Sequence, residues 1–269
     1  MATSIPAEAT ANADRFYTVV KSLNNFDNLE VHGVIATLLL PSQEDVCFVG
    51  TYYRARADIE SILQFQNPKH FQAIAMLARG LFELAVDMRL LEVIPNSAIK
   101  MKEFTDVEKL RSARQAVAFK TANPDADVEI TSHLAFIKNN ADRLDNVQRC
   151  LWPGVQRVYH WSGLRMRQRV QLLKAPFEQL YEVEYPQLSW YVHPGLTGVA
   201  NLKAETFTYL CSHAFNFAAN AYVEVLRAVI RKFKLDKTSE NIEKKIKAAR
   251  LFPFADTPDQ VDALTRSMQ

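Results

Sequence analysis

The feature that most constrains the fold is a charged column inside an apolar segment, residues 73–94. Most side chains of this segment are Leu, Ile, Val, Met, Phe or Ala. Arg79, Glu83 and Asp87 recur every four residues, so a helix places them on one face, with Arg89 close by. Charges on an otherwise buried helix need partners, because an unpaired buried charge is very costly. The segment therefore predicts a central helix that carries an internal polar cluster.

Two interpretations of this column stay open. Arg79 is suited to fixing a phosphate or stabilising a developing negative charge, and Glu83 is suited to acting as a base. A salt bridge that fixes helix register accounts for the same residues. In either case we expect Arg79 to pair with Glu83 or with an acid from another helix, and both side chains to be mostly buried.

Helical periodicity dominates the rest of the chain. Glycine is sparse, with 7 in 269 residues, and no alternating strand pair is evident. Ser42 and Asp45 form a capping box that opens a long helix, and Pro186 is expected to kink a later one. We predict an all-α fold, a single helical bundle of about seven to nine helices over residues 1–251, with peripheral N- and C-terminal helices. A loosely held tail is expected over 252–269.

Two apolar runs, residues 37–40 and 46–53, also have a composition that suits strands. Their neighbours are compatible with helix, so we expect helix for both. The first run then closes an apolar helical segment over residues 29–40.

Composition is that of an ordinary soluble globular protein, with 48% hydrophobic and 23% charged residues. The N-terminus lacks the basic and apolar regions of a signal peptide, and residues 73–94 carry five charges, too many for a membrane span. We therefore expect a cytoplasmic protein without membrane association. Its three cysteines have no paired spacing and are expected to be reduced: Cys47, Cys150 and Cys211.

The formal net charge of +2 hides two basic stretches. Residues 155–174 contain five basic residues and no acid, and residues 227–250 contain nine basic and three acidic residues. Such polarity suits RNA or another anionic partner, although solvated helix faces give the same counts. A homodimer is a further open expectation. The candidate nucleic-acid contacts lie in the second stretch: Arg227, Arg231, Lys232 and Lys234.

A polar and aromatic group, YHWSG, precedes a predicted helix near residue 163. His160 and Trp161 are candidate ligand-binding residues within it. A Ser/His nucleophile pair made by Ser162 and His160 would need a third group and an oxyanion hole. Ser162 is also explained as the cap of the following helix.

A second group lies before the break at Pro194. Tyr185, Ser189 and His193 are spaced by four, so one helix presents them on one face. At a helix C-terminus the dipole favours a charged imidazole, which makes His193 a candidate acid or base. The next long helix carries a polar stripe that faces either solvent or the interior: His213, Asn216, Asn220 and Glu224.

Motifs for metal ions and cofactors are missing from the sequence. There is no Glu-x-x-His, no His-Glu-x-x-His, no phosphate-binding loop with Gly-Lys-Ser/Thr and no Gly-x-Gly-x-x-Gly. We predict neither a metal site nor a cofactor.

Several short motifs occur in the order found in a known bacterial family. They are ARGLFE from residue 78, HWSG from residue 160, two tyrosines and LSWYVHPG from residue 188. Over residues 71–234 the chain resembles domain of unknown function 5677. The resemblance implies an all-helical fold and an internal site around these residues: Arg79, Glu83, Trp161, Tyr185, Ser189 and His193.

The chain is also loosely similar to the HEPN helical superfamily. Active members are metal-independent ribonucleases of toxin–antitoxin and phage-defence systems, in which an Arg precedes a His at a helix end by four to six residues. His193 has the right setting, but residues 185–187 contain no Arg. Arg79 from another helix is then the candidate cation.

We predict a binding or regulatory module, in a defence or toxin–antitoxin context. The alternative is a metal-independent ribonuclease or nucleotide-acting enzyme with His193 as general acid or base. Buried polar groups need one another as partners, so the separate motifs are expected to line one pocket. His193 should then lie within roughly 10 Å of Arg79 and Glu83.

Overall fold

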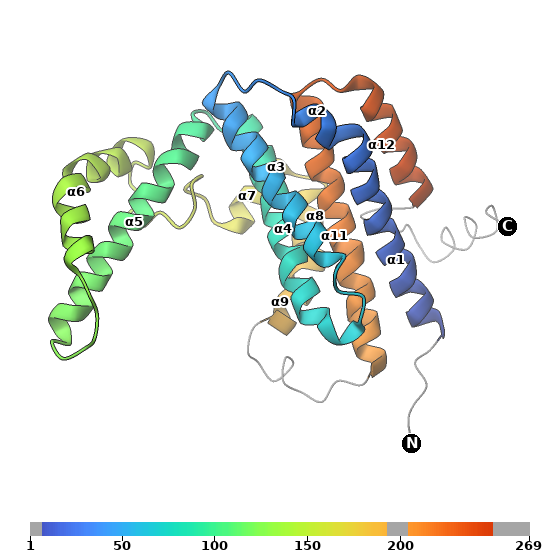
Figure 1. Cartoon of the computed structure of the whole chain (residues 1–269), viewed down its shortest axis with the longest axis horizontal. Coiled ribbons are helices and arrows are strands. Elements are labelled where there is room, and N and C mark those ends of the chain that lie inside the picture. Colours follow the sequence, from blue (N-terminus) through green and yellow to red (C-terminus); the bar gives the residue numbers. More distant parts are fainter. Residues whose placement is uncertain (1–6, 193–203, 250–269) are drawn as a thin grey trace. The chain divides into compact units, whose positions relative to one another are not determined.

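The computed structural model describes residues 7–192 and 204–249, and every regular element in these ranges is helical (Figure 1). The predicted all-α fold is confirmed. The described chain forms two compact units. The small unit comprises Pro41–Cys47 and Leu90–Arg169, and the bundle unit holds the rest. The expectation of a single domain over 1–251 stays a prediction.

Both units are built from helices. The bundle unit draws on these elements: α1 (Ala7–Phe26), the π-helix η1 (Asp27–His32), α2 (Gly33–Ile35), α3 (Gln43–Ile62), the 3-10 helix η2 (Pro68–His70), α4 (Phe71–Val93), α8 (Phe177–Gln179), the π-helix η3 (Leu180–Glu184), α9 (Tyr185–Val192), α11 (Ala204–Lys232) and α12 (Asp236–Ala249). The small unit contains α5 (Ser97–Ala122) and α6 (Thr131–Leu151), together with the first turns of α3 and the last residues of α4. α7 (Met166–Leu173) begins in the small unit and ends in the bundle unit.

The apolar faces of α4 and α11 form the core of the bundle unit. Phe82 of α4 is fully buried, and its ring centre lies 5.2 Å from that of Phe217 on α11. α1 packs along α11 and buries Val20 and Leu23. α12 also packs on α11, and its Ile242 is buried. The bundle unit therefore rests on apolar stripes of helical period, as its sequence pattern indicates.

Local signals near Pro41 have mixed outcomes. Ser42 and Asp45 form the predicted capping box, with the Asp45 amide donating to Ser42 Oγ at 3.1 Å and the Ser42 amide donating to Asp45 Oδ2 at 3.3 Å. The helix expected over residues 29–40 ends at Ile35 instead, and Leu39 is 93% exposed. Pro41 disfavours the helical conformation of Leu40, and the helix already ends five residues before that position.

Pro186 changes the winding of its helix. The five residues before Tyr185 form the π-helix η3, and ordinary α-helix resumes at Tyr185. Proline has no amide hydrogen and cannot donate to the carbonyl of Glu182, four residues earlier. The kink expected at Pro186 thus takes the form of a wider π-helical turn, which changes the direction of the side chains that follow it.

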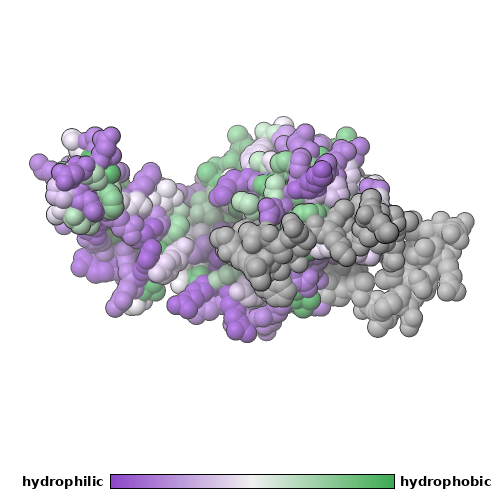
Figure 2. Space-filling model, turned by 90° about the horizontal axis from the view of Figure 1, so that it is seen from below, coloured by the Kyte–Doolittle hydropathy of each residue, from purple (hydrophilic) through white to green (hydrophobic). Residues whose placement is uncertain are grey.

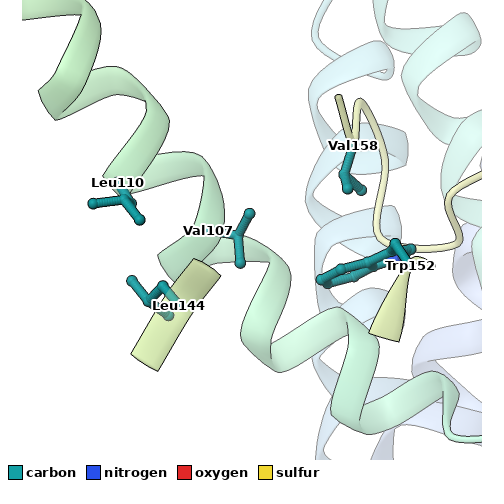
Figure 3. Packing of buried hydrophobic residues seen from close by; sticks show 5 residues of the cluster. All are labelled: Val107, Leu110, Leu144, Trp152 and Val158. Atoms are coloured by element: carbon teal, nitrogen blue, oxygen red, sulfur yellow. The ribbon is translucent and has the colours of Figure 1, made fainter. Parts of the chain in front are cut away.

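The small unit is a helical pair with its own core. Five buried side chains meet there, two from α5, one from α6 and two from the chain that follows α6 (Figure 3). Hydrophilic residues cover much of the visible face of α5 and α6 (Figure 2), as expected for helices that bury only one stripe. The five core residues are Val107, Leu110, Leu144, Trp152 and Val158.

Candidate functional site

The charged column of α4 meets a tyrosine from α9. Arg79 Nη2 donates a hydrogen bond to the Tyr185 hydroxyl at 2.9 Å, and that hydroxyl donates to Glu83 Oε1 at 2.8 Å. The guanidinium carbon of Arg79 also lies 4.9 Å from the centre of the Tyr185 ring. A phenol both accepts and donates, so Tyr185 links the cation to the carboxylate. The structure thus brings together three of the predicted site residues.

This cluster differs from the expected buried salt bridge. The link between Arg79 and Glu83 runs through the Tyr185 hydroxyl, and all three side chains are half-buried. The four-residue spacing places both charges on one face of α4, but it cannot reveal a hydroxyl that arrives from another helix. Arg79 Nε is buried and has no hydrogen-bond partner in the part of the chain that the structure describes.

Electrostatics and aromatic packing define the chemistry of Tyr185. Burial raises the pKa of its hydroxyl, the hydrogen bond from Arg79 opposes this rise, and the Glu83 carboxylate adds to it. The ring centre of Tyr185 lies 5.2 Å from that of Tyr181 and 5.7 Å from that of Phe82. The phenol therefore stays protonated near neutral pH and serves as a hydrogen-bonding group between fixed partners.

Of the two other candidate residues near Tyr185, the structure describes Ser189 but not His193. Ser189 Oγ donates to the carbonyl of Tyr185 at 3.0 Å, a bond back to the preceding helical turn that leaves the hydroxyl proton engaged. His193 lies outside the described residues. Its predicted position near Arg79 and its role as acid or base therefore stay predictions.

The polar stripe of α11 faces the protein interior. Asn220 and Glu224 are each 6% exposed. At one end of the stripe, His213 Nδ1 lies 3.0 Å from Glu184 Oε2, and both side chains are 20% exposed. At the other end, burial and a neighbouring arginine lower the pKa of Arg89 on α4, and the charge of Glu224 opposes this shift. Of the two interpretations left open, the inward one is correct.

His160 and Ser162 form a compact hydrogen-bonded turn in the small unit. His160 Nδ1 lies 2.8 Å from Ser162 Oγ, and His160 Nε2 lies 3.0 Å from Arg169 Nη1. Arg169 can only donate toward Nε2, and the Ser162 amide donates toward Nδ1 at 3.2 Å, so both ring nitrogens face donors of the chain. A Ser/His nucleophile needs a carboxylate behind the histidine, and here Arg169 holds that place. The turn therefore does not have the geometry of a serine hydrolase.

Trp161 is part of the same turn and is 3% exposed. Its carbonyl accepts a hydrogen bond from Trp152 Nε1 at 2.8 Å. Gly163 follows with a φ of +74°, and a Cβ at this position would lie 2.8 Å from Trp152 Cδ1. Only glycine suits both the left-handed conformation and the close approach of the indole. Among the described residues, Trp161 acts as a packing element of the small unit.

The basic residues proposed as nucleic-acid contacts are partly engaged within the bundle unit. Arg227 donates to Glu224 Oε1 at 2.7 Å and to both carboxylate oxygens of Glu243 at 2.8 Å. These bonds, chiefly those to Glu243, raise the pKa of Arg227 and tie α11 to α12. Nucleic-acid contact stays a prediction for Arg227 and for the three cations at or just beyond the end of α11: Arg231, Lys232 and Lys234.

A buried cluster surrounds Asp27, which the sequence did not identify as a site residue. Asp27 is fully buried and accepts hydrogen bonds from the hydroxyls of Tyr52 at 2.5 Å and Tyr222 at 2.7 Å. Arg56 Nη1 donates to the same carboxylate at 2.6 Å. Burial raises the pKa of Asp27, and these three partners oppose the rise. The available signal was the four-residue spacing of Tyr52 and Arg56, the spacing that identified the Arg79 column.

Comparison with known proteins places the chain in a family. The model of DUF5677, a family of unknown function, matches residues 45–206. The chain belongs to this family. The match extends from the first turn of α3 to the start of α11, so it includes both Arg79 and Tyr185. No curated protein and no solved structure matches the chain.

Three further findings concern membranes, metals and thiols. In residues 7–192 and 204–249, no helix combines the length and the apolar character that a membrane span needs. Across the same described residues, His, Cys, Asp and Glu side chains do not gather in groups of three or more that suit a metal ion. Among the described residues, Cys47, Cys150 and Cys211 form no disulfide.

Proposed function

We propose that the chain is a binding or regulatory module whose Arg79–Tyr185–Glu83 cluster receives an anionic group. The observation that carries the proposal is the Arg79 guanidinium. It is held in place by Tyr185, yet its buried Nε–H has no partner among the described residues. A buried donor without a partner costs about 1–3 kcal/mol. A carboxylate or phosphate oxygen that reaches this donor would recover that cost.

The remaining groups favour binding over catalysis. The Tyr185 hydroxyl is committed as donor to Glu83 and as acceptor from Arg79. The Ser189 hydroxyl is committed to its own helix. A nucleophile needs a base within hydrogen-bonding distance that can take up its proton. Ser189 has none among the described side chains, and Tyr185 has Glu83 at 2.8 Å but a hydroxyl whose pKa is raised by burial.

The test is a thermal-unfolding series with inorganic phosphate and with acetate at matched ionic strength. A ligand that binds only the folded protein raises the midpoint temperature. At a ligand concentration of a hundred times the dissociation constant, it adds about 2.7 kcal/mol to the free energy of unfolding. Arg79→Gln should remove this rise, and Tyr185→Phe should reduce it. Tyr181→Phe is the matched control, because it removes a neighbouring hydroxyl and leaves Arg79 and Tyr185 intact. A rise of equal size in Arg79→Gln would contradict the proposal.

A metal-independent ribonuclease is the second candidate, and one contact favours it. The helix that leads to His193, α9, contains no arginine, and Arg79 of α4 bonds to its first residue, Tyr185. Arg79 would then act as phosphate clamp and His193 as general acid or base. The test is cleavage of a labelled RNA in the presence of a metal chelator. Activity that is lost in His193→Ala and in Arg79→Gln, with helicity retained, would favour the enzyme, and no cleavage by the wild type would exclude it.

The biological setting belongs to the same proposal. A cytoplasmic module with an anionic partner, RNA included, suits a defence or toxin–antitoxin system, and a homodimer would present two copies of the site. Sedimentation equilibrium of the full chain tests the dimer. Co-purification with RNA that resists high salt tests the partner, because purely electrostatic contacts are lost as salt rises.

A further inference from the structure

A charged groove lies on the small unit, separate from the Arg79 cluster. It has a volume of about 570 Å³ and is lined by α5, α6 and residues 156–158. Val107, Leu110 and Val158 line it and also belong to the buried core seen in Figure 3. The groove therefore has a floor of packed side chains, which holds its walls in place.

The walls carry an excess of positive charge. Four arginines line the groove against two carboxylates. One carboxylate, Asp145, is bound by both terminal nitrogens of Arg114 at 2.8 and 2.7 Å. The other, Glu108, is bound by Arg111 through its Nε at 3.0 Å and its Nη2 at 2.5 Å. The other two arginines of the wall are exposed and supply the excess charge: Arg149 and Arg157.

An exposed aromatic ring stands beside these cations. Tyr159 is 70% exposed, and the guanidinium carbon of Arg157 lies 4.5 Å from its ring centre. Glu108 raises the pKa of Arg111 through its hydrogen bonds, and Tyr159 adds to this rise. Two exposed glutamine amides complete the walls: Gln115 and Gln156.

We propose that this groove binds a phosphate-bearing nucleotide, as one unit of an unpaired RNA strand or as a free nucleotide. Arg149 and Arg157 would contact phosphate, the ring of Tyr159 would stack on the base, and the amides would bond its edge. The volume is within the usual range of small-ligand pockets, about 300–1,000 Å³. A purely acidic peptide would use the arginines but not the exposed ring. The proposal is independent of the Arg79 site.

The test uses the full chain and a fluorescein-labelled oligouridine of about twelve nucleotides, followed by fluorescence anisotropy at about 50 and 200 mM salt. Arg149→Gln and Arg157→Gln should each weaken binding and reduce the salt slope by about one. Tyr159→Ala should weaken it roughly 5- to 100-fold, whereas Tyr159→Phe keeps the ring and should bind normally. Arg143→Gln is the charge control, because Arg143 is on the same helix and pairs with Glu103 at 3.0 Å.

Competitors distinguish the sources of the ligand. Displacement by uridine monophosphate supports a free nucleotide, and displacement only by unlabelled strand supports RNA. Four results would overturn the proposal. The first two are that the labelled strand fails to bind at low salt and that Tyr159→Ala binds it with wild-type affinity. The other two are that polyglutamate or duplex RNA displaces it as well as the unlabelled strand does. Circular dichroism of each variant shows that the fold is kept.

Discussion

Removal of the Tyr222 hydroxyl should destabilise the bundle unit. In Tyr222→Phe the ring still fills its fully buried place on α11, but Asp27 Oδ2 loses a donor at 2.7 Å. A hydrogen bond to a charged group contributes about 1.5–3 kcal/mol, and the carboxylate cannot recruit water at zero exposure. For a chain of this size the expected fall in midpoint temperature is roughly 3–12 °C. Tyr52→Phe should have a similar effect, since its hydroxyl also donates to Asp27.

The assay is urea denaturation followed by far-ultraviolet circular dichroism. Tyr209→Phe is the matched control, because Tyr209 lies on the same helix and is 50% exposed. It should change the free energy of unfolding by less than about 0.5 kcal/mol. The double variant of Tyr52 and Tyr222 should show a coupling of at least about 0.5 kcal/mol, because both hydroxyls bind one carboxylate. Tyr222→Phe with the stability of Tyr209→Phe would refute the reasoning.

Three other changes test separate parts of the fold. Burial raises the pKa of Asp27 above its usual 3.8. This shift therefore stabilises the folded state fully below about pH 3.8, and the stabilisation is lost as pH rises through the pKa of the folded state. The stability difference between wild type and Asp27→Asn should therefore grow as pH falls from about 7 to about 4 in urea titrations, and a difference that shrinks would contradict this sign. Gly163→Ala should cost about 1–3 kcal/mol, read from tryptophan fluorescence, because its φ is +74° and a Cβ would lie 2.8 Å from Trp152. Ser42→Ala should cost about 1 kcal/mol in thermal melts, since it removes the acceptor of the Asp45 amide, and an unchanged melt would show that the cap is unimportant.

Sequence reasoning succeeded where one helix carries the signal. The apolar period of α4 and its charges every four residues were enough to predict a helix with a polar cluster. The capping box at Ser42 was found for the same reason, since its two residues are three apart in the chain. Such features depend on local geometry alone. The sequence also predicted Tyr185 as a site residue, but its position between Arg79 and Glu83 required coordinates.

Reasoning from the sequence failed where partners are distant in the chain. Asp27 is followed by Asn in a segment that reads as a turn, and its Tyr222 partner is 195 positions away. Arg227 looks like a free cation in a basic stretch until Glu243 of α12 binds it. Arg157 lies in a basic stretch of the sequence and Arg149 outside it, and the fold of α6 and the following loop places both in one groove. In each case tertiary packing, which the sequence does not reveal, decides which charges are neutralised.

The two polar clusters of the bundle unit differ in how fully their polar groups are hydrogen-bonded. Both begin with an arginine and a partner four residues away on one helix. Arg56 serves a carboxylate with zero exposure that also accepts two tyrosine hydroxyls, so that cluster has no place for a ligand. Arg79 bonds to Tyr185 in a half-buried cluster, and its buried Nε–H has no partner among the described residues. Satisfied groups stabilise a fold, whereas an unsatisfied donor at a half-buried position is stabilised further when a ligand supplies the acceptor.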